Sequence, residues 1–208
     1  MISIQGLTYR YKQGPTLQFA DWHLKQQEQW LLLGASGSGK STLINIMSGL
    51  LRPESGRVEI SGTSLYGLSA RELDRFRGRH IGIVFQRPHL VRSLRVAENL
   101  ELAQSMAGLR SDRKRIDLLL GELGLSEKSD RYPDELSQGQ LQRLSVARAL
   151  VNKPLVLIAD EPTSSLDDQN AESVIALLRE QAAANEATLL IATHDKRVRD
   201  HLNNEYIL

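Results

Sequence analysis

The stretch GASGSGKS, residues 34–41, decides the fold class of this 208-residue chain. It matches the pattern G-x-x-x-x-G-K-[ST] at every fixed position. A short apolar run, residues 30–33, precedes it, and residues 40–51 follow it with apolar side chains at helical spacing. The pattern requires this order of strand, glycine loop and helix. We therefore interpret the loop as a phosphate-binding turn rather than a Gly/Ser-rich linker.

The residue types of this loop fit the chemistry of a bound nucleoside triphosphate. Its glycines allow backbone angles that let successive N–H groups point inward, and the next helix adds the positive end of its dipole. Lys40 can reach the β- and γ-phosphates, the hydroxyl of Ser41 can bind Mg²⁺, and Thr42 adds a further hydroxyl. The residues expected to contact the nucleotide here are Gly34, Ala35, Ser36, Gly37, Ser38, Gly39, Lys40, Ser41 and Thr42.

Three more apolar runs, residues 81–85, 155–159 and 188–192, predict buried strands farther along the chain. Helical patterns lie between them, for example at residues 168–184. Strand, loop and helix units that recur in this way are typical of an α/β fold with a mostly parallel sheet. The carboxyl ends of parallel strands lie at one edge of the sheet, and ligands bind at that edge.

Polar side chains follow each of these three runs. Gln86 follows the first, Asp160 and Glu161 follow the second, and His194 comes shortly after the third. Each could be an ordinary loop residue, but their shared position at the expected edge favours a site. We expect Asp160 to face magnesium and Glu161 to orient or deprotonate the attacking water. Gln86 would touch magnesium or that water, and His194 would hydrogen-bond the γ-phosphate. The expected catalytic residues are Glu161, His194, Gln86 and Lys40, and the expected magnesium ligands are Ser41, Gln86 and Asp160.

The N-terminal part of the chain predicts further strands. Residues 2–9 alternate between apolar and polar side chains, residues 57–60 form a short strand pattern, and residues 17–24 are another candidate. Ser69 with Glu72 forms a capping-box pattern, which predicts the start of a helix.

The middle of the chain differs, because helical patterns at residues 96–107 and 111–123 follow one another with no strand between them. A further helix is expected at residues 137–150. We interpret this part as a helical subdomain inserted into one domain. The expected division of residues 1–208 is a nucleotide-binding core, residues 1–87 and 151–208, and an approximate helical subdomain, residues 88–150.

The stretch LSQGQ, residues 136–140, opens the last of these helices. Ser137 can cap the helix, but its hydroxyl can also donate to a phosphate, and Gly139 lets a phosphate approach the backbone. The glycine loop already covers the phosphates from one side, and one chain would hardly bring both sites to one nucleotide. We therefore expect two chains, each presenting Ser137, Gly139 and Gln140 to the nucleotide held by the other.

Composition limits the alternatives. Hydrophobic residues at 41% and charged residues at 25% are ordinary for a globular domain, and a formal net charge of +1 gives no reason to expect a nucleic-acid partner. The sequence contains no cysteine, which excludes disulfides and thiolate metal sites. It shows no run of about 18 apolar residues and no signal-peptide pattern at its start, so we expect another subunit to hold it at any membrane.

Taken together, these motifs resemble the nucleotide-binding domain of an ABC transporter. They are GASGSGKST (34–42), the glutamine after IGIVF (Gln86), LSQGQ (136–140), LVLIADE (155–161), SSLD (164–167) and His194, in the family's order over nearly the whole chain. The resemblance implies an ABC ATPase fold: a P-loop NTPase core with an N-terminal antiparallel β subdomain and an inserted α-helical subdomain. It also implies ATP and Mg²⁺ as ligands, a head-to-tail homodimer around two nucleotides, and ATP hydrolysis that powers a membrane permease.

The resemblance adds several residues to the expected site. Tyr11 occupies the place of an aromatic that stacks on adenine, with Tyr9 as a rival. Asp167 is expected to bridge the dimer, and residues 88–99 are expected to receive the coupling helices of the permease. The chain departs from the family's usual LSGGQ, because Gln138 replaces the first glycine, and this could alter the γ-phosphate contact or the dimer affinity.

The stretch IGIVFQRPHLVRSLRVAENL, residues 81–100, is similar to one branch of the family. That branch contains the lipoprotein-releasing ATPases, the macrolide and peptide exporter ATPases, and the cell-division ATPase paired with an extracytoplasmic-loop permease. We expect an ATPase subunit on the cytoplasmic side of the inner or plasma membrane, attached through its permease, that drives export or membrane extraction of a lipoprotein, lipid, peptide or drug. The alternative is a mechanotransmission ATPase that transports nothing and regulates a cell-envelope process through an FtsX-like membrane partner. The sequence leaves both open.

Other ATPase classes fit less well. Chromosome-maintenance ATPases of the ABC type need a long coiled coil between the glycine loop and the LSQGQ stretch, and that interval is too short here. Translation factors of this type carry two such domains in one chain. A P-loop kinase has no role for LSQGQ or for His194.

Overall fold

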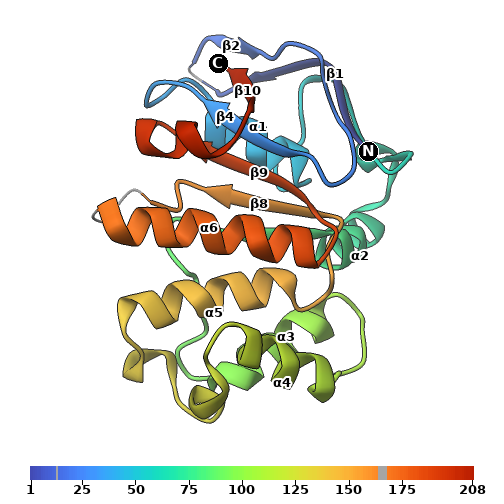
Figure 1. Cartoon of the computed structure of the whole chain (residues 1–208). Helices are drawn as coiled ribbons and strands as arrows, with labels where there is room; N and C mark the ends of the chain where they lie inside the picture. The colour runs from blue at the N-terminus through green and yellow to red at the C-terminus, as the bar shows by residue number, and fades with distance from the viewer. Residues whose placement is uncertain (13, 164–167) are drawn as a thin grey trace.

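A computed structural model describes residues 1–12, 14–163 and 168–208 as two β-sheets with helices around them (Figure 1). The strands are β1 (Ile2–Arg10), β2 (Thr16–Gln18), β3 (Trp22–Leu24), β4 (Gln29–Leu33), β5 (Ser55–Ile60), β6 (Thr63–Ser64), β7 (Ile81–Val84), β8 (Val156–Asp160), β9 (Thr188–Thr193) and β10 (Asn204–Ile207). The helices are α1 (Lys40–Met47), α2 (Ala70–His80), α3 (Val96–Met106), α4 (Arg113–Glu122), α5 (Gln138–Leu150) and α6 (Asp168–Ala184). Short 3₁₀ turns lie at Leu65–Gly67, Ser126–Lys128, Pro133–Glu135 and Lys196–His201.

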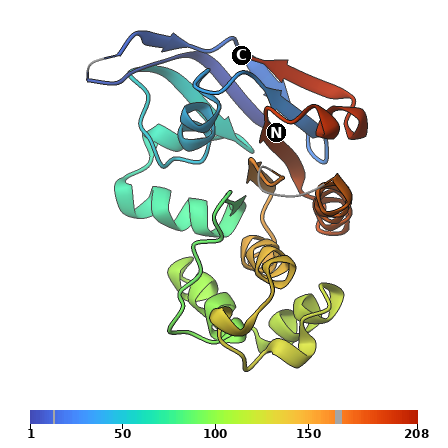
Figure 2. The same cartoon turned by 90° about the vertical axis from the view of Figure 1, so that its left-hand side faces the viewer.

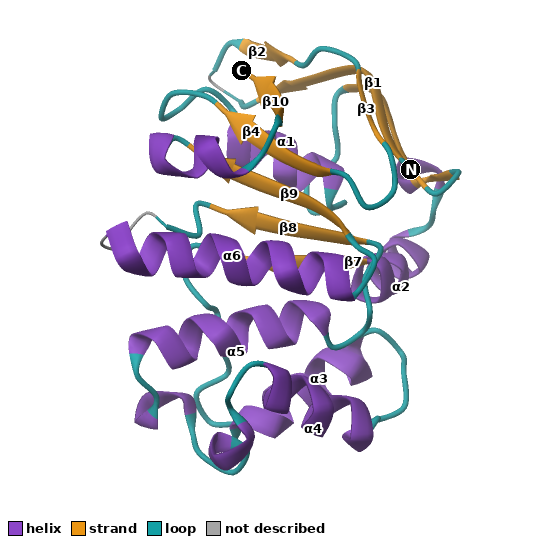
Figure 3. Ribbon diagram, viewed as in Figure 1, coloured by secondary structure: helices purple, strands orange, loops and turns teal. Residues whose placement is uncertain are grey.

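The larger sheet is parallel, with the strand order β10-β4-β9-β8-β7 (Figure 3). Its register places Leu33 of β4 opposite Thr193 of β9, and Ala192 of β9 opposite Asp160 of β8. The carboxyl ends of these strands therefore meet at one edge of the sheet. The glycine loop leaves the sheet at this edge, because it follows β4 directly and leads into α1.

Both faces of the parallel sheet are covered, which explains why its central strands are apolar throughout. Val156 and Ile158 of β8 point to a core shared with α1, while Leu157 and Ala159 point to a core shared with α5 and α6. All six residues of β9 are buried. The sheet thus lies between two hydrophobic cores, and the polar residues of its central strands β8 and β9 lie at the strand ends.

The smaller sheet is antiparallel and has β1 at its centre, paired with β2, β3 and β5, while β6 extends it beyond β5. It lies over α1 in the view of Figure 2. Its apolar face, including Ile2, Ile4 and Val58, shares a hydrophobic core with Leu43 and Met47 of α1. This packing brings the hairpin between β1 and β2 to the start of α1.

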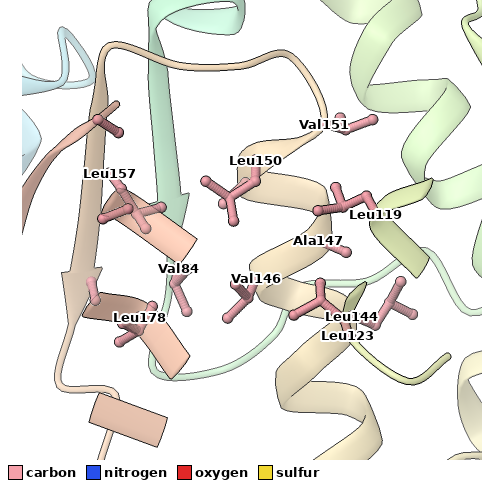
Figure 4. Packing of buried hydrophobic residues seen from close by; sticks show 14 of the residues in the cluster. Val84, Leu119, Leu123, Leu144, Val146, Ala147, Leu150, Val151, Leu157 and Leu178 are labelled. Carbon is pink, nitrogen blue, oxygen red and sulfur yellow. The ribbon is translucent and has the colours of Figure 1, made fainter. Parts of the chain in front are cut away.

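Helices α3, α4 and α5 pack together on the other side of the molecule, and α5 joins them to the parallel sheet. In Figure 4, Leu150 of α5 faces Val84 and Leu157 of the sheet, whereas Ala147 faces Leu119 of α4. One hydrophobic cluster therefore runs from the sheet through α5 into the helical part. Among the described residues, no helix has both the length and the apolarity needed to cross a membrane.

The expected fold class is confirmed, but the helix predicted at residues 40–51 ends earlier, at Met47. Gly49 adopts a φ of +72°, which leaves the helical region. The N–H groups of Leu50 and Leu51 both donate to the carbonyl of Asn45, at 2.8 and 3.0 Å. The apolar periodicity continues through this turn, so sequence spacing alone overestimated the helix.

One strand prediction also needed correction, and the C-terminal strand was not predicted. Residues 17–24 form two strands rather than one, because β2 and β3 pair with opposite ends of β1 across an irregularity between Gln5 and Thr8. Strand β10 was missed. It has four residues without apolar alternation, and its place depends on pairing with β4 at the edge of the sheet.

Candidate active site

A cavity of about 550 Å³ opens at the carboxyl edge of the parallel sheet, beside the start of α1. It collects side chains that follow β4, β7, β8 and β9, together with the β1–β2 hairpin. Its lining residues are Tyr11, Pro15, Leu17, Ser36, Gly37, Gly39, Lys40, Ser41, Thr42, Gln86, Glu161 and His194. The structure thus brings together the glycine loop, Gln86, Glu161 and His194, which lie up to 160 positions apart by residue number (34 to 194).

The glycine loop holds its backbone in conformations that suit an anion. Gly39 is the N-cap of α1 with a φ of +103°, and a β-carbon there would lie 3.3 Å from Leu17. The buried Lys40 donates from Nζ to the carbonyls of Gly34 (2.8 Å) and Ala35 (3.1 Å). Among the described residues, the buried hydroxyl of Ser38 has no hydrogen-bond partner. A cation, an orphaned hydroxyl and an uncapped helix start fit a phosphate group.

Asp160, the last residue of β8, lies next to Ser41 at the start of α1. Oγ of Ser41 is 3.5 Å from Oδ1 of Asp160. Burial raises the pKa of Asp160, and the neighbouring carboxylate of Glu161 raises it further, against the lowering effects of Ser41 and Lys40. The described residues contain no group of three or more His, Cys, Asp or Glu side chains that could hold a metal. A hydroxyl beside one half-buried carboxylate nevertheless fits Mg²⁺ in phosphate sites, because water and phosphate oxygens supply its other ligands.

Glu161 comes next in the chain and occupies a strained conformation, with a φ of +49°. Its N–H donates to the carbonyl of Ala192 (2.8 Å), which anchors it to β9. Its Oε1 lies 2.8 Å from Nδ1 of His194 and 3.5 Å from Nζ of Lys40. The carboxylate therefore stands between the loop lysine and the histidine, facing the cavity.

The β1–β2 hairpin closes one side of the cavity. The hydroxyl of Tyr11 lies 2.9 Å from Oγ1 of Thr42, and the ring is half exposed. Tyr9 does not line the cavity, although its ring makes an edge contact with Tyr11 at 4.8 Å between centroids. Sequence reasoning missed Pro15 and Leu17 as walls of the cavity. Their only signal was the turn composition before β2, which does not indicate what the hairpin faces.

The LSQGQ residues do not line this cavity. Ser137 and Gly139 are exposed at the start of α5, and the chain forms a capping box there. Oγ of Ser137 accepts from the N–H of Gln140 (3.3 Å), and Oε1 of Gln140 accepts from the N–H of Ser137 (2.9 Å). A β-carbon on Gly139 would meet no atom within 4 Å, so nothing in the described chain requires a glycine there. Asp167, expected to bridge a dimer, lies outside the described residues.

Gln138 and Gly139 line a different cavity, of about 370 Å³, between α5 and α6. The other residues of its lining are Gln142, Arg143, Ser173, Val174 and Leu177. Gln138, which replaces the first glycine of the family's usual LSGGQ, thus lies beside α6.

Comparison with known proteins identifies the family to which this geometry belongs. A family model described as ABC transporter matches residues 17–164. The chain belongs to the ABC transporter family. Curated relatives of this ABC protein include the macrolide export ATP-binding/permease protein MacB 2 of Aeromonas hydrophila, at 42% identity over 207 residues, 97% of this chain and 32% of that protein. The ABC transporter ATP-binding protein YtrE of Bacillus subtilis is 36% identical, over 95% of this chain and 90% of that protein.

A lipoprotein-releasing system ATP-binding protein, LolD of Saccharophagus degradans, is 35% identical over 95% of this chain and 90% of its own length. The chain therefore spans about a third of the macrolide exporters it matches, but most of these two separate ATP-binding proteins. Among solved structures, a dimeric post-hydrolysis state of the ATP-binding cassette MJ0796, bound to ADP and Pi, has a TM-score of 0.86 at 33% identity, over 100% of this chain and 94% of that one. The structure of cbiO1 from Clostridium perfringens, described as part of a transporter complex, has a TM-score of 0.87 at 32% identity, over 99% of this chain and 83% of that one.

Proposed function

We propose that this ABC protein binds and hydrolyses ATP and thereby powers a membrane permease. The observation that carries the proposal is the cavity at the carboxyl edge of the sheet, where the glycine loop meets Glu161 and His194. An anion-binding loop next to a carboxylate that can accept a proton is the arrangement that phosphoryl transfer to water requires. The solved relative MJ0796, whose structure holds ADP and Pi, supports the same chemistry.

Nucleotide binding would use the lysine of the glycine loop and the residues around it. Lys40 would exchange its bonds to the carbonyls of Gly34 and Ala35 for bonds to phosphate oxygens. The ring of Tyr11, half exposed beside Thr42, is the proposed stacking partner for adenine. Ser41, Asp160 and Gln86 are the proposed ligands of Mg²⁺, which when bound would neutralise charge on the phosphate oxygens.

Glu161 is the proposed general base. The oxygen of a water molecule attacks the γ-phosphorus, one proton of that water passes to the carboxylate, and the bond to the bridging oxygen breaks to leave ADP and phosphate. Nδ1 of His194 donates to Oε1 of Glu161, because an ionised carboxylate can only accept. His194 would thus hold this oxygen in place and contact the γ-phosphate, while Gln86 would orient the water.

The rest of the site would come from a second copy of the chain. Ser137, Gly139 and Gln140 lie outside the cavity at an exposed helix start, and Gly139 leaves that start open to close approach. We propose a head-to-tail homodimer in which this helix start meets the ATP held by the partner chain, with Asp167 at the contact. The dimeric MJ0796 structure supports this assembly.

A cavity of about 270 Å³ between β7 and α5 is the proposed docking site of the permease. Its lining includes His89, one of residues 88–99, and Arg77 and Arg148 give it a cationic character. The chain would then sit on the cytoplasmic side of the membrane, attached through this contact. Relatives named for macrolide export and lipoprotein release support export or membrane extraction over the regulatory alternative.

The proposed function is tested by Glu161→Gln, which keeps the size of the side chain but removes its basicity. We expect ATP turnover to fall by about 10²- to 10⁴-fold, the usual contribution of a positioned base, while ATP affinity is retained. Steady-state hydrolysis and an equilibrium binding assay measure the two quantities. Near-normal turnover would reject Glu161 as the base.

Two further variants complete the test. Lys40→Ala should weaken nucleotide binding itself, because the lysine is the buried cation of the loop. Glu28→Gln is the matched control. This carboxylate is bonded to Trp30 and the N–H of Lys25 away from the cavity, so both turnover and ATP affinity should remain unchanged.

A further inference from the structure

The two oxygens of the Glu161 carboxylate have different surroundings. Oε1 faces the cavity, with His194 at 2.8 Å and Lys40 at 3.5 Å. Oε2 accepts a hydrogen bond from the hydroxyl of Thr193, at 3.2 Å. Thr193 is the last residue of β9 and is fully buried, so this contact approaches the carboxylate from the sheet.

The proton of the Thr193 hydroxyl has a defined direction. The N–H of Asp195 donates to Oγ1 of Thr193 at 2.9 Å, which occupies an acceptor site of the hydroxyl. A carboxylate accepts only, so the hydroxyl proton points at Oε2 of Glu161. The carboxyl group of Asp195 in turn accepts from the hydroxyl of buried Thr163, at 3.0 Å, which fixes the turn after β9.

This contact matters because the backbone of Glu161 is in a left-handed conformation that glutamate rarely adopts. The N–H of Glu161 is tied to Ala192, and its side chain is tied to Thr193, the next residue of the same strand. Both hydrogen bonds are made with residues at the carboxyl end of β9, a strand of the sheet that is buried on both faces. The strand thus sets both the place of the residue and the rotation of its carboxylate.

We infer that Thr193 is a positioning residue for hydrolysis: its hydroxyl holds Oε2 of Glu161 so that Oε1 faces the cavity and accepts the proton of the attacking water. The inference rests on the proposed role of Glu161 and adds which oxygen acts and what orients it. A base that must take a proton along a short hydrogen bond loses efficiency when its acceptor atom can rotate away. Thr193 acts through Glu161 and does not itself line the cavity.

The test compares Thr193→Val with Thr188→Val in the full-length chain. Thr188 is equally buried at the opposite end of β9, where its hydroxyl accepts from the N–H of Gln27 (3.1 Å) and donates to the carbonyl of Lys25 (3.2 Å). Both variants therefore lose a buried hydroxyl with two partners. We expect kcat for ATP to fall about 10- to 100-fold in Thr193→Val with KM nearly unchanged, and to stay near normal in Thr188→Val.

Two further measurements separate positioning from a structural effect. Thr193→Ser keeps the hydroxyl and should restore kcat to within about threefold of the parent. In a Glu161→Gln background, Thr193→Val should change the residual rate by less than about twofold, because no base is left to orient. Thr193→Ala serves in the same comparisons if the valine variant does not fold.

The outcomes are distinct. The inference is overturned if Thr193→Val is no slower than Thr188→Val, if Thr193→Ser is as slow as Thr193→Val, or if the valine slows the Glu161→Gln protein as much as the parent. In each of these cases a slow Glu161→Gln protein would leave the proposed general base intact. A normal rate in Glu161→Gln would instead overturn the general base, and the positioning role with it.

Discussion

The starts of α1 and α5 carry the two motifs of this chain that suit a phosphate, and they are built in opposite ways. Helix α1 begins after Gly39, which supplies no side-chain cap. Within the described part of the chain, the first N–H that bonds back to this start is that of Leu43, to the carbonyl of Gly39 (2.9 Å). Helix α5 begins after Ser137, which forms a complete capping box with Gln140.

The start of α1 is also enclosed by the chain, whereas the start of α5 is exposed. Lys40 at the start of α1 is buried within a cavity and paired with Glu161. Ser137 and Gly139 at the start of α5 are exposed and do not line that cavity. A helix start that binds a ligand by itself keeps its donors free, because each donor satisfied within the chain is lost to the phosphate. A helix start presented to another chain must be stable before that chain arrives, and side-chain capping provides this stability.

Substitutions of Gly39 and Gly139 test the difference between the two helix starts most strongly. Gly39→Ala places a side chain at a φ of +103°, with its β-carbon 3.3 Å from Leu17, so the loop must change conformation. We expect ATP affinity to fall at least about 100-fold, since moving the loop misdirects several charge-assisted bonds to the phosphates. Titration with Mg-ATP in a calorimeter measures the change.

Gly139→Ala is the matched substitution at the other helix start. Its β-carbon meets nothing within 4 Å, so the affinity of a single chain for ATP should stay the same. Equal affinities in the two alanine variants would show that the α1 loop tolerates a side chain and that the two helix starts do not differ as described.

A smaller effect is expected from the caps. Ser137→Ala should lower kcat/KM for ATP about tenfold, the effect of one hydrogen bond to a charged group, if this hydroxyl meets a phosphate across the dimer. Ser69→Ala is the matched control, because Ser69 forms the same capping box with Glu72 at the start of α2. Each variant should lose about 1 kcal/mol of unfolding free energy.

Steady-state kinetics and chemical denaturation of both serine variants separate the two roles. The comparison fails if Ser69→Ala slows hydrolysis as much as Ser137→Ala, because capping would then account for the whole effect. An unchanged rate in both variants would remove Ser137 from the proposed shared site.

The sequence predicted which side chains meet in the cavity, because the rule it used depends on short-range patterns. Gln86 and Glu161 follow apolar runs and line the cavity, because the carboxyl ends of parallel strands meet wherever such runs form one sheet. The nearby wall formed by Leu17 depends instead on how the antiparallel sheet packs over α1. No local pattern encodes that packing.

The orientation of Glu161 could not be predicted from the sequence either. A glutamate gives no local signal for a φ of +49°, and its hydrogen bond to Thr193 follows from the register of β8 and β9. Strand β10 could not be predicted for the same reason, because its four residues become a strand only through pairing with β4. Sequence patterns thus predicted several of the side chains that line the cavity, while tertiary contacts determined its finer geometry.

The smallest expected effect is on stability, and it sharpens the contrast between the two helix starts. Gly139→Ala should raise the free energy of unfolding by about 0.5–1 kcal/mol, because alanine is the better helix former and the added methyl group meets no atom. A chain of this size should then melt about 1–4 °C higher, which differential scanning calorimetry can detect.

The same Gly139→Ala variant should hydrolyse ATP more slowly, since the methyl group would stand where a phosphate of the ATP held by the partner chain approaches. A stabler protein with reduced turnover would mean that Gly139 serves a contact made between chains. If stability rises while turnover stays normal, the start of α5 is an ordinary capped helix end and its likeness to a phosphate site has no consequence for hydrolysis.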